Sequence, residues 1–166
     1  MRRMIEQALT KHETVRVISE IGNHDDHTSI MLATCLAQFY EREPRVEVDD
    51  SPKNLHWYRF GRNLVVTTHT DKLKGERLYQ VIAHDLAKEW GETKFRYCYG
   101  GHVHHDSEKE MAGLTVMTMR TLAPQDDWHT KQGYRAGQDM KCDVLHREFG
   151  RIERHIVGIE QISEAA

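Results

Sequence analysis

The chain has 166 residues, of which 39% are hydrophobic and 30% charged, and its formal net charge is −3 at pH 7 with histidine neutral. These values fit one globular domain, or one part of a larger one, and they argue against a disordered chain or a strong overall attraction to nucleic acid or an anionic membrane. No apolar run approaches the roughly 20 residues that a membrane span needs, and no signal-peptide pattern is present, so no membrane partner is expected.

The first seventy residues alternate between helix and strand patterns. In chain order, the patterns predict a helix over 2–12, a buried strand over 15–22, a helix over 30–43, a short strand over 45–50 and a hairpin over 54–70. Thr28 or Ser29 is expected to cap the second of these helices, and Pro44 is expected to stop it. A Gly-Arg-Asn turn at 61–63 is expected to join the two strands of the hairpin.

The rest of the chain predicts one more helix and then mostly strands. In chain order, these are a helix over 75–90 closed by Gly91, a strand over 94–101, a hairpin over 106–122 turning at Ala112 and Gly113, and a hairpin over 138–162 turning near Gly150. The whole pattern predicts one mixed α/β domain over residues 1–166, with helices between the early strands and hairpins late in the chain.

A long loop over 123–137 separates the last two predicted hairpins, and this length raises the expectation of a function. Trp128, Tyr134 and Arg135 lie in the loop. Aromatic rings beside cations can stack bases and hold phosphates, but a Trp that packs the loop onto the sheet is at least as good an interpretation.

Cysteine and histidine usage narrows the kinds of site to consider. Cys35, Cys98 and Cys142 are far apart and odd in number, without a CxxC pair, which indicates reduced thiols in a cytoplasmic protein. Twelve histidines are unusual for this length, and clusters of them in polar loops favour metal binding or acid–base chemistry.

Three polar loops each follow a predicted strand. They are the Gly-Asn-His-Asp loop at 22–25, His69 after the strand "NLVVTT", and the Gly-Gly-His-Val-His loop at 100–104 after "KFRYCY". Because strand ends that face one edge of a sheet bring their loops together, these loops are expected to meet. In an extended backbone, alternation would place His102 and His104 on the same side. Two imidazoles, a third from His69 and the amide oxygen of Asn23 would suit a divalent ion.

These three segments, in this order, resemble motifs of the calcineurin-like metallophosphoesterase superfamily. The family's Gly-Asn-His-Asp/Glu motif matches residues 22–25, its single histidine after a strand matches His69, and its Gly-His-x-His motif matches residues 101–104. The resemblance covers roughly residues 15 to 120. It implies an α-β-β-α sandwich with a mixed sheet, of which this chain would be the C-terminal half.

The resemblance also implies a role for each matched residue. The second metal would be bound by Asn23, His69 and His102, the first metal by His104, and the leaving oxygen would be stabilised or protonated by His24, which Asp25 would orient. The implied reaction is hydrolysis of a phosphoester, with two divalent ions about 3.5–4 Å apart clamping the phosphate. Mn²⁺ is the expected metal, with Zn²⁺, Fe²⁺ or Ni²⁺ as alternatives. The segments "HTDKLK" and "RTLAP" resemble the phage and bacterial exonuclease-like branch, which makes DNA a candidate substrate.

Two family motifs have no counterpart here. An Asp-x-His and a Gly-Asp-x-x-Asp should precede Gly22, but residues 1–21 contain no aspartate. The family's bridging carboxylate comes from these motifs. Three hypotheses follow: an active phosphoesterase completed by a companion chain or an upstream segment, an inactive remnant that binds metal weakly, or a non-enzymatic interaction domain. An incomplete sandwich would expose apolar sheet surface, so self-association is also expected.

Each candidate residue also has an ordinary structural interpretation. The histidines of the 100–104 loop could be surface residues in a turn, His69 could make one hydrogen bond at a strand end, and residues 23–25 could form an Asx turn before a helix. His105 is expected to be exposed or to support its neighbours. Lys72 and Lys74 could contact phosphate or belong to a solvated turn, and the sequence does not favour either interpretation.

Overall fold

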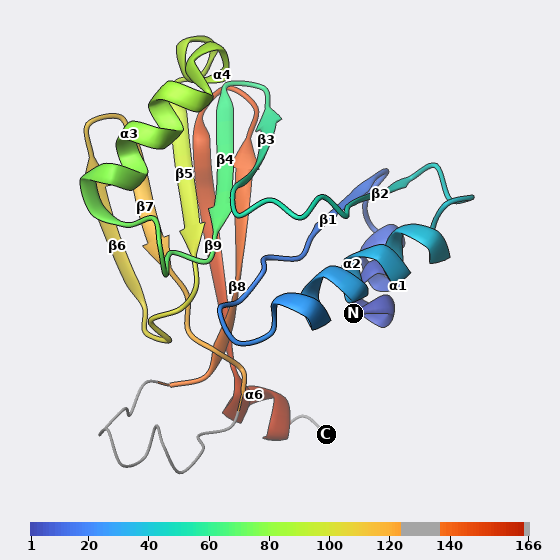
Figure 1. Cartoon of the computed structure of the whole chain (residues 1–166). Helices are drawn as coiled ribbons and strands as arrows, with labels where there is room; N and C mark the ends of the chain where they lie inside the picture. The colour runs from blue at the N-terminus through green and yellow to red at the C-terminus, as the bar shows by residue number, and fades with distance from the viewer. Residues whose placement is uncertain (124–136, 165–166) are drawn as a thin grey trace. The chain divides into compact units, whose positions relative to one another are not determined.

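The computed structural model describes residues 1–123 and 137–164 (Figure 1). The chain divides into two compact units, Met1–His56 and Trp57–Ala166, each described here by itself. The predicted single domain over 1–166, and the four-layer arrangement of the sandwich, therefore stay predictions. Trp128, Tyr134 and Arg135 of the predicted long loop lie outside the described residues.

The first unit packs two helices with a small parallel sheet. Its elements are α1 (Arg2–Leu9), β1 (Val15–Ile18), α2 (Asp26–Phe39) and β2 (Val46–Asp49). β1 and β2 pair in parallel, with Val17 opposite Val48. The buried core consists of Ile5, Val17, Leu36 and Tyr40. Helical spacing places Ile5 toward this core while Met4 remains 59% exposed, so the amphipathic pattern of residues 2–12 correctly predicted a helix.

The ends of α2 differ from the prediction. The helix begins at Asp26 and its N-cap is Asp25, whose carbonyl accepts a hydrogen bond from the amide of Ser29 at 2.9 Å. Capping by Thr28 or Ser29 was therefore wrong, because Asp is an equally favourable N-cap residue and comes earlier. The helix ends at Phe39, well before Pro44. A turn in which the amide of Glu43 donates to the carbonyl of Tyr40 at 2.9 Å already redirects the chain there.

The second unit contains a five-stranded mixed sheet. Its strands in spatial order are β3 (His56–Phe60), β4 (Asn63–Thr68), β5 (Phe95–Gly100), β7 (Leu114–Thr118) and β6 (Ser107–Met111). β3 starts at the last residue of the first unit. β4, β5 and β7 are parallel, and β6 is antiparallel to β7. The predicted turns at 61–63 and at Ala112–Gly113 are confirmed, and Gly61 and Gly113 have φ values of 57° and 82° that favour glycine.

One face of this sheet is covered by the helical segment between β4 and β5 (Figure 1). The segment consists of α3 (Gly75–Asp85) and α4 (Ala87–Glu92), so the continuous helix predicted over 75–90 is broken at Leu86, and Gly91 lies inside α4 instead of closing it. The break is associated with tertiary contacts of Trp90, whose ring lies 5.4 Å from that of Tyr79 and 4.4 Å from the guanidinium of Arg96. The buried core consists of Leu64, Val66, Leu78, Ile82, Cys98, Leu114 and Met117.

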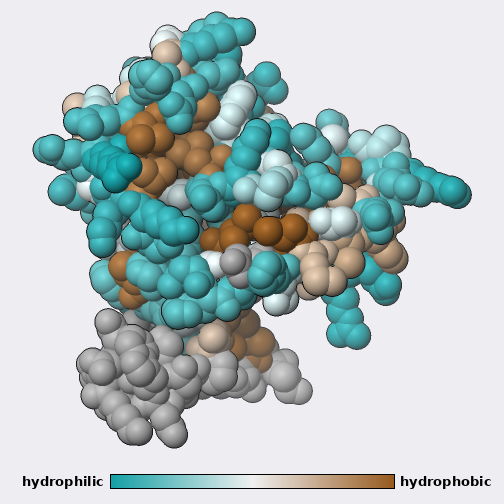
Figure 2. Space-filling model, in the orientation of Figure 1, coloured by the Kyte–Doolittle hydropathy of each residue, from teal (hydrophilic) through white to brown (hydrophobic). Residues whose placement is uncertain are grey.

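The last predicted hairpin is also confirmed. β8 (Asp139–His146) and β9 (Gly150–Gly158) form a two-stranded antiparallel sheet with a register shift at Val144 and Leu145. The chain then enters a short helix, α6 (Ile159–Glu164), where the prediction extended the strand to 162. The amide of Gly158 donates to the Gln161 side chain at 2.8 Å, which helps end the strand. These elements establish the mixed α/β class with late hairpins. The molecular face drawn in Figure 2 is mostly polar, and its apolar residues form separate patches.

Candidate functional site

Two of the three predicted polar loops lie at the same edge of the five-stranded sheet. In the parallel pairing of β4 with β5, Thr68 is opposite Gly100, and Gly100 is also opposite Thr118 of β7. His69 and Gly101 immediately follow Thr68 and Gly100. The carboxyl ends of adjacent parallel strands therefore bring the His69 and 100–104 segments together, as the sequence predicted.

The imidazole rings of His69 and His102 meet at this edge. Their centroids are 5.2 Å apart and their planes make an angle of 73°. A Cβ on Gly101 would lie 3.2 Å from Nδ1 of His69, a tight contact, so glycine lets the backbone approach this ring closely. His69 is half-buried and His102 is exposed. The arrangement is a pair of aromatic nitrogen donors on adjacent strand ends.

Thr70 holds the two strand ends together. Its hydroxyl donates to the carbonyl of Gly101 at 3.1 Å, and its backbone adopts φ 65°, which is uncommon for a β-branched residue. A Cβ on Gly100 would lie only 2.4 Å from the Thr70 methyl group. The glycine pair at 100–101 is therefore explained by contacts with Thr70 and His69.

The 101–106 loop is coiled, so the extended backbone on which the alternation of His102 and His104 depended is not present. His102 and His104 both have positive φ values, 67° and 54°. The amide of Val103 donates to the carbonyl of Gly101 at 2.8 Å, which folds the loop back on itself, and the β7 residue Thr118 donates to the carbonyl of His105 at 2.8 Å. Alternation along a strand consequently does not decide where His102 and His104 point. His105 is exposed, in agreement with the prediction.

The third predicted loop belongs to the first unit. Asn23, His24 and Asp25 lie between β1 and α2, and all three are exposed. β1 pairs with β2 and is not a strand of the five-stranded sheet. Asp25 is the N-cap of α2, without a side-chain capping hydrogen bond. A meeting of Asn23 and His24 with the histidines of the second unit therefore stays a prediction.

The donor set fits a metal only in part. His69 and His102 supply two imidazoles at close range, which is the ligand chemistry that borderline divalent ions accept. Among the residues that the structure describes, no three His, Cys, Asp or Glu side chains are grouped so that they could hold a metal ion. A complete site would need further donors.

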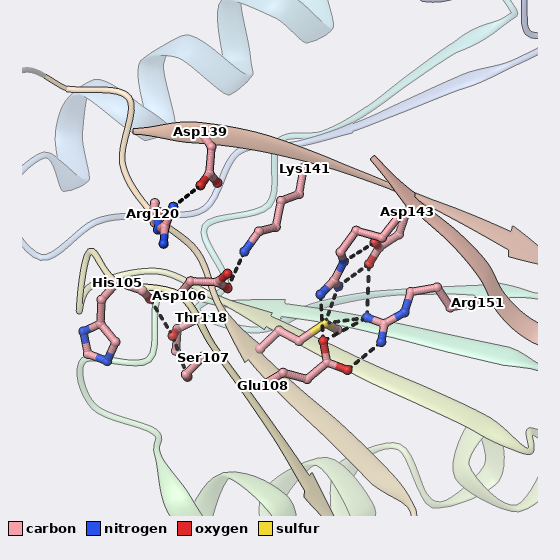
Figure 3. A network of polar contacts seen from close by, with 12 residues as sticks. His105, Asp106, Ser107, Glu108, Thr118, Arg120, Asp139, Lys141, Asp143 and Arg151 are labelled. Atoms are coloured by element: carbon pink, nitrogen blue, oxygen red, sulfur yellow. Dashed lines mark hydrogen bonds and ion pairs between the residues drawn. The ribbon is translucent and has the colours of Figure 1, made fainter. Parts of the chain in front are cut away.

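A network of ion pairs beside this edge was not predicted (Figure 3). Asp143 accepts hydrogen bonds from Tyr99 at 2.6 Å and from Arg154 at 2.6 and 2.7 Å. Glu108 accepts from Arg154 at 2.7 Å and from Arg151 at 2.5 and 3.2 Å. In β8, charged residues alternate with apolar ones with a period of two, a pattern that by itself would direct the apolar face inward. The structure shows instead that Asp139, Lys141 and Asp143 are the more buried residues of this strand.

The charges in this network neutralise one another. Hydrogen bonds from Arg151 lower the pKa of Glu108, and those from Lys141 lower the pKa of Asp106, in both cases against the effect of burial. Burial alone would raise the pKa of Asp143, but hydrogen bonds from Arg154 and Tyr99 outweigh it, so this pKa is also lowered. The carboxylates are thus charged beside charged partners.

A cleft of about 580 Å³ opens next to this network. It is lined by Tyr99, Met119, Arg120, Thr121, Leu122, Asp139, Met140, Lys141 and Asp143. Both cations of its wall are already paired, Arg120 with Asp139 at 2.6 Å and Lys141 with Asp106. Since each positive charge is matched by a carboxylate, the cleft does not favour an anionic ligand such as phosphate.

Comparisons with known proteins do not assign the chain to a family. No protein-family model and no curated protein matches the chain. One solved structure aligns with this chain in a structural comparison. It is a conserved uncharacterised protein and predicted phosphoesterase from Streptococcus pneumoniae TIGR4, and the alignment has 11% sequence identity and covers 86% of this chain and 96% of that chain. The TM-score is 0.35, which does not establish a common fold. None of the helices among the described residues has the length and apolar character to cross a membrane.

Proposed function

We propose that this chain carries part of the metal site of a phosphoesterase that hydrolyses phosphodiesters with divalent ions. The single observation that supports the proposal best is the 5.2 Å approach of the His69 and His102 rings at the ends of adjacent parallel strands. Three motifs of the calcineurin-like superfamily also match this sequence in the same order, at residues 22–25, at His69 and at residues 101–104. Mn²⁺ is the proposed metal, DNA a candidate substrate, and the cytoplasm the proposed location.

Each residue has a distinct part in this proposal. His69 and His102 hold one ion with the amide oxygen of Asn23, and His104 contributes to a second ion. A bound divalent ion supplies Lewis-acid polarisation of the phosphoryl oxygens and neutralises developing charge. His24 holds a proton for the leaving oxygen, and Asp25 orients its ring. The carboxylate that would bridge two ions comes from a companion chain or from further sequence.

The proposal is tested by calorimetric titration of Mn²⁺ into the wild-type chain and three histidine variants. His69→Ala and His102→Ala should each weaken Mn²⁺ binding by at least about tenfold, because each removes a direct donor. His84→Ala is the matched control, since the His84 side chain is 88% exposed on α3 and its ring pairs with the adjacent Asp85. Titration without measurable Mn²⁺ binding, or equal affinity in His102→Ala and the wild type, would contradict the proposal.

A second candidate is a domain that binds one metal without turnover. The absence of a third His, Cys, Asp or Glu donor near His69 and His102 among the described residues favours it. Hydrolysis of bis-p-nitrophenyl phosphate in Mn²⁺ separates the two candidates when a segment that carries the missing Asp-x-His and Gly-Asp-x-x-Asp motifs is added to the chain. Mn²⁺ binding that depends on His102 but occurs without hydrolysis would favour the domain that binds without turnover.

A further inference from the structure

The loop that carries His102 and His104 has a conformation that needs support from the residues around it. Both histidines have positive φ values, 67° and 54°. This backbone region is unfavourable for residues with a side chain, and it persists in a folded protein where surrounding contacts impose it. At the first residue of the loop, the carbonyl of Gly101 accepts a hydrogen bond from the hydroxyl of Thr70 at 3.1 Å. The other end of the loop is held by two different strands, β7 and β8.

Asp106, the last residue of the loop, forms an ion pair with Lys141 of β8 (Figure 3). The Lys141 side chain is only 6% exposed, whereas that of Asp106 is 36% exposed. An ammonium group removed from water depends on its carboxylate partner, so the buried lysine holds the aspartate in place. One residue earlier, the carbonyl of His105 accepts a hydrogen bond from Thr118 of β7 at 2.8 Å.

The strand that carries Lys141 is itself fixed on both sides of this residue. Two positions before it, Asp139 pairs with Arg120 at 2.6 Å, and two positions after it, Asp143 accepts a hydrogen bond from Tyr99 at 2.6 Å. The side chains of Asp139 and Asp143 are 5% and 6% exposed. Tyr99 lies on β5, two residues before the loop begins. β8 is therefore a firm support beside the strand end from which the loop departs.

We propose that Lys141 is a positioning residue for the metal site. Through Asp106 it holds the loop in the conformation that places the ring of His102 5.2 Å from the ring of His69. Lys141 itself does not touch the metal. This inference rests on the proposed function, because it assigns Lys141 an effect on metal affinity that depends on the loop histidines being ligands. Residues that support metal ligands in this way typically contribute ten- to a hundredfold to affinity.

A different role for Asp106 makes the opposite prediction. Carboxylate oxygens bind divalent ions, so Asp106 could be a metal ligand for which Lys141 competes. In the part of the chain that the structure describes, Asp106 does not join His69 and His102 in a group that could hold a metal ion. Removal of the Lys141 charge would strengthen Mn²⁺ binding if Asp106 were a ligand. It would weaken Mn²⁺ binding if Lys141 positions the loop.

The first experiment is calorimetric titration of Mn²⁺ into the full chain. Lys141→Met should weaken Mn²⁺ binding roughly tenfold, and Lys141→Arg, which keeps the positive charge, should restore most of the affinity. Methionine suits the test because it fills similar space, and the half-exposed Asp106 stays hydrated without its partner. Lys109→Met is the matched control, since Lys109 is exposed on β6. Equal or tighter Mn²⁺ binding in Lys141→Met, or an equal loss in Lys109→Met, would overturn the proposal.

A double-mutant cycle tests whether Lys141 acts through Asp106. Asp106→Asn should weaken Mn²⁺ binding about as much as Lys141→Met does, and the double variant should be no weaker than either single variant. Asp106→Asn also tests the pair by itself if Lys141→Met is too unstable to titrate. Losses that simply add in the double variant would overturn the route through Asp106.

Amide hydrogen exchange without metal separates this inference from the proposed function. The amide of Val103 donates to the carbonyl of Gly101 at 2.8 Å, so its protection reports the conformation of the loop. Lys141→Met and Asp106→Asn should each reduce this protection while β4 and β5 stay protected. A wild type that binds no Mn²⁺ would contradict the proposed function. Unchanged protection of Val103, or faster exchange throughout the second unit, would overturn the role of Lys141 whatever the titration shows.

Discussion

At the scale of single residues, Asp49 is the clearest source of pH-dependent stability in the first unit. Burial would raise its pKa, but hydrogen bonds from Ser51, at 2.6 Å, and from His56 outweigh burial and lower the pKa from 3.8 to about 2. Oδ2 of Asp49 lies 3.1 Å from Nδ1 of His56, whose side chain is only 1% exposed. A carboxyl group whose pKa is lower in the folded state than in the unfolded state stabilises the folded state at pH values above the unfolded-state pKa.

The first unit should therefore lose stability as the pH falls from about 4 toward 2, by on the order of 2 kcal/mol. Asp49→Asn should be less stable than the wild type at neutral pH and should lack this acid-dependent loss. Urea unfolding at several pH values measures both effects. Asp50→Asn, which changes the exposed neighbouring carboxylate, is the control and should retain the wild-type pH dependence. Identical acid profiles for Asp49→Asn and the wild type would contradict the assignment.

At the scale of elements, two hairpin turns of the second unit support each other. Gly61, in the β3–β4 turn, has φ 57°, and a Cβ there would lie 2.5 Å from the carbonyl oxygen of Arg147 in the β8–β9 turn. The amide of Arg62 donates to the same carbonyl at 2.8 Å, and the Asn63 side chain donates to the carbonyl of His146 at 2.9 Å. The turns thus join the five-stranded sheet to the late hairpin.

Gly61→Ala should destabilise the second unit more than Gly75→Ala, by roughly 1–3 kcal/mol. Both glycines have positive φ, 57° and 60°, so both variants share the backbone strain of alanine in that region. Only Gly61 has a close neighbour, because no atom lies within 4 Å of a Cβ on Gly75. The difference in chemical unfolding free energy therefore isolates the turn contact, and equal losses would show that this contact is relaxed at little cost.

At the scale of the whole molecule, the division into Met1–His56 and Trp57–Ala166 predicts separate responses to core mutations. Leu36 is 7% exposed in the first core, and Ile82 is fully buried in the second. Leu36→Ala should cost about 2–5 kcal/mol, and amide exchange should accelerate in α1, α2, β1 and β2 while β4 and β5 stay protected. Ile82→Ala should have the reverse effect. Acceleration throughout the chain in both variants would instead indicate one cooperative unit.

Local patterns in the sequence predicted most elements of both units. Hydrophobic periodicity identified the helices and strands, and the glycines near 61, 113 and 150 identified three hairpin turns, because turn geometry depends on a few adjacent residues. The errors at the ends of α2 and β9 involve local turns, whereas two others involve contacts with other residues of the second unit. The break at Leu86 accompanies the contacts of Trp90 with Tyr79 and Arg96. The network around Asp143 joins residues from four strands, β5, β6, β8 and β9.

By itself, the sequence determined which residues stand at strand ends and therefore which histidines are candidates for a site. Only the tertiary structure decided that β4 and β5 lie side by side, in parallel and in a register that pairs Thr68 with Gly100, so that the rings of His69 and His102 meet. The tertiary structure also decided that the loop after Gly101 coils, so that strand alternation does not apply to His102 and His104. The physical reason is that strand pairing depends on contacts between residues some thirty positions apart, which local propensity does not encode.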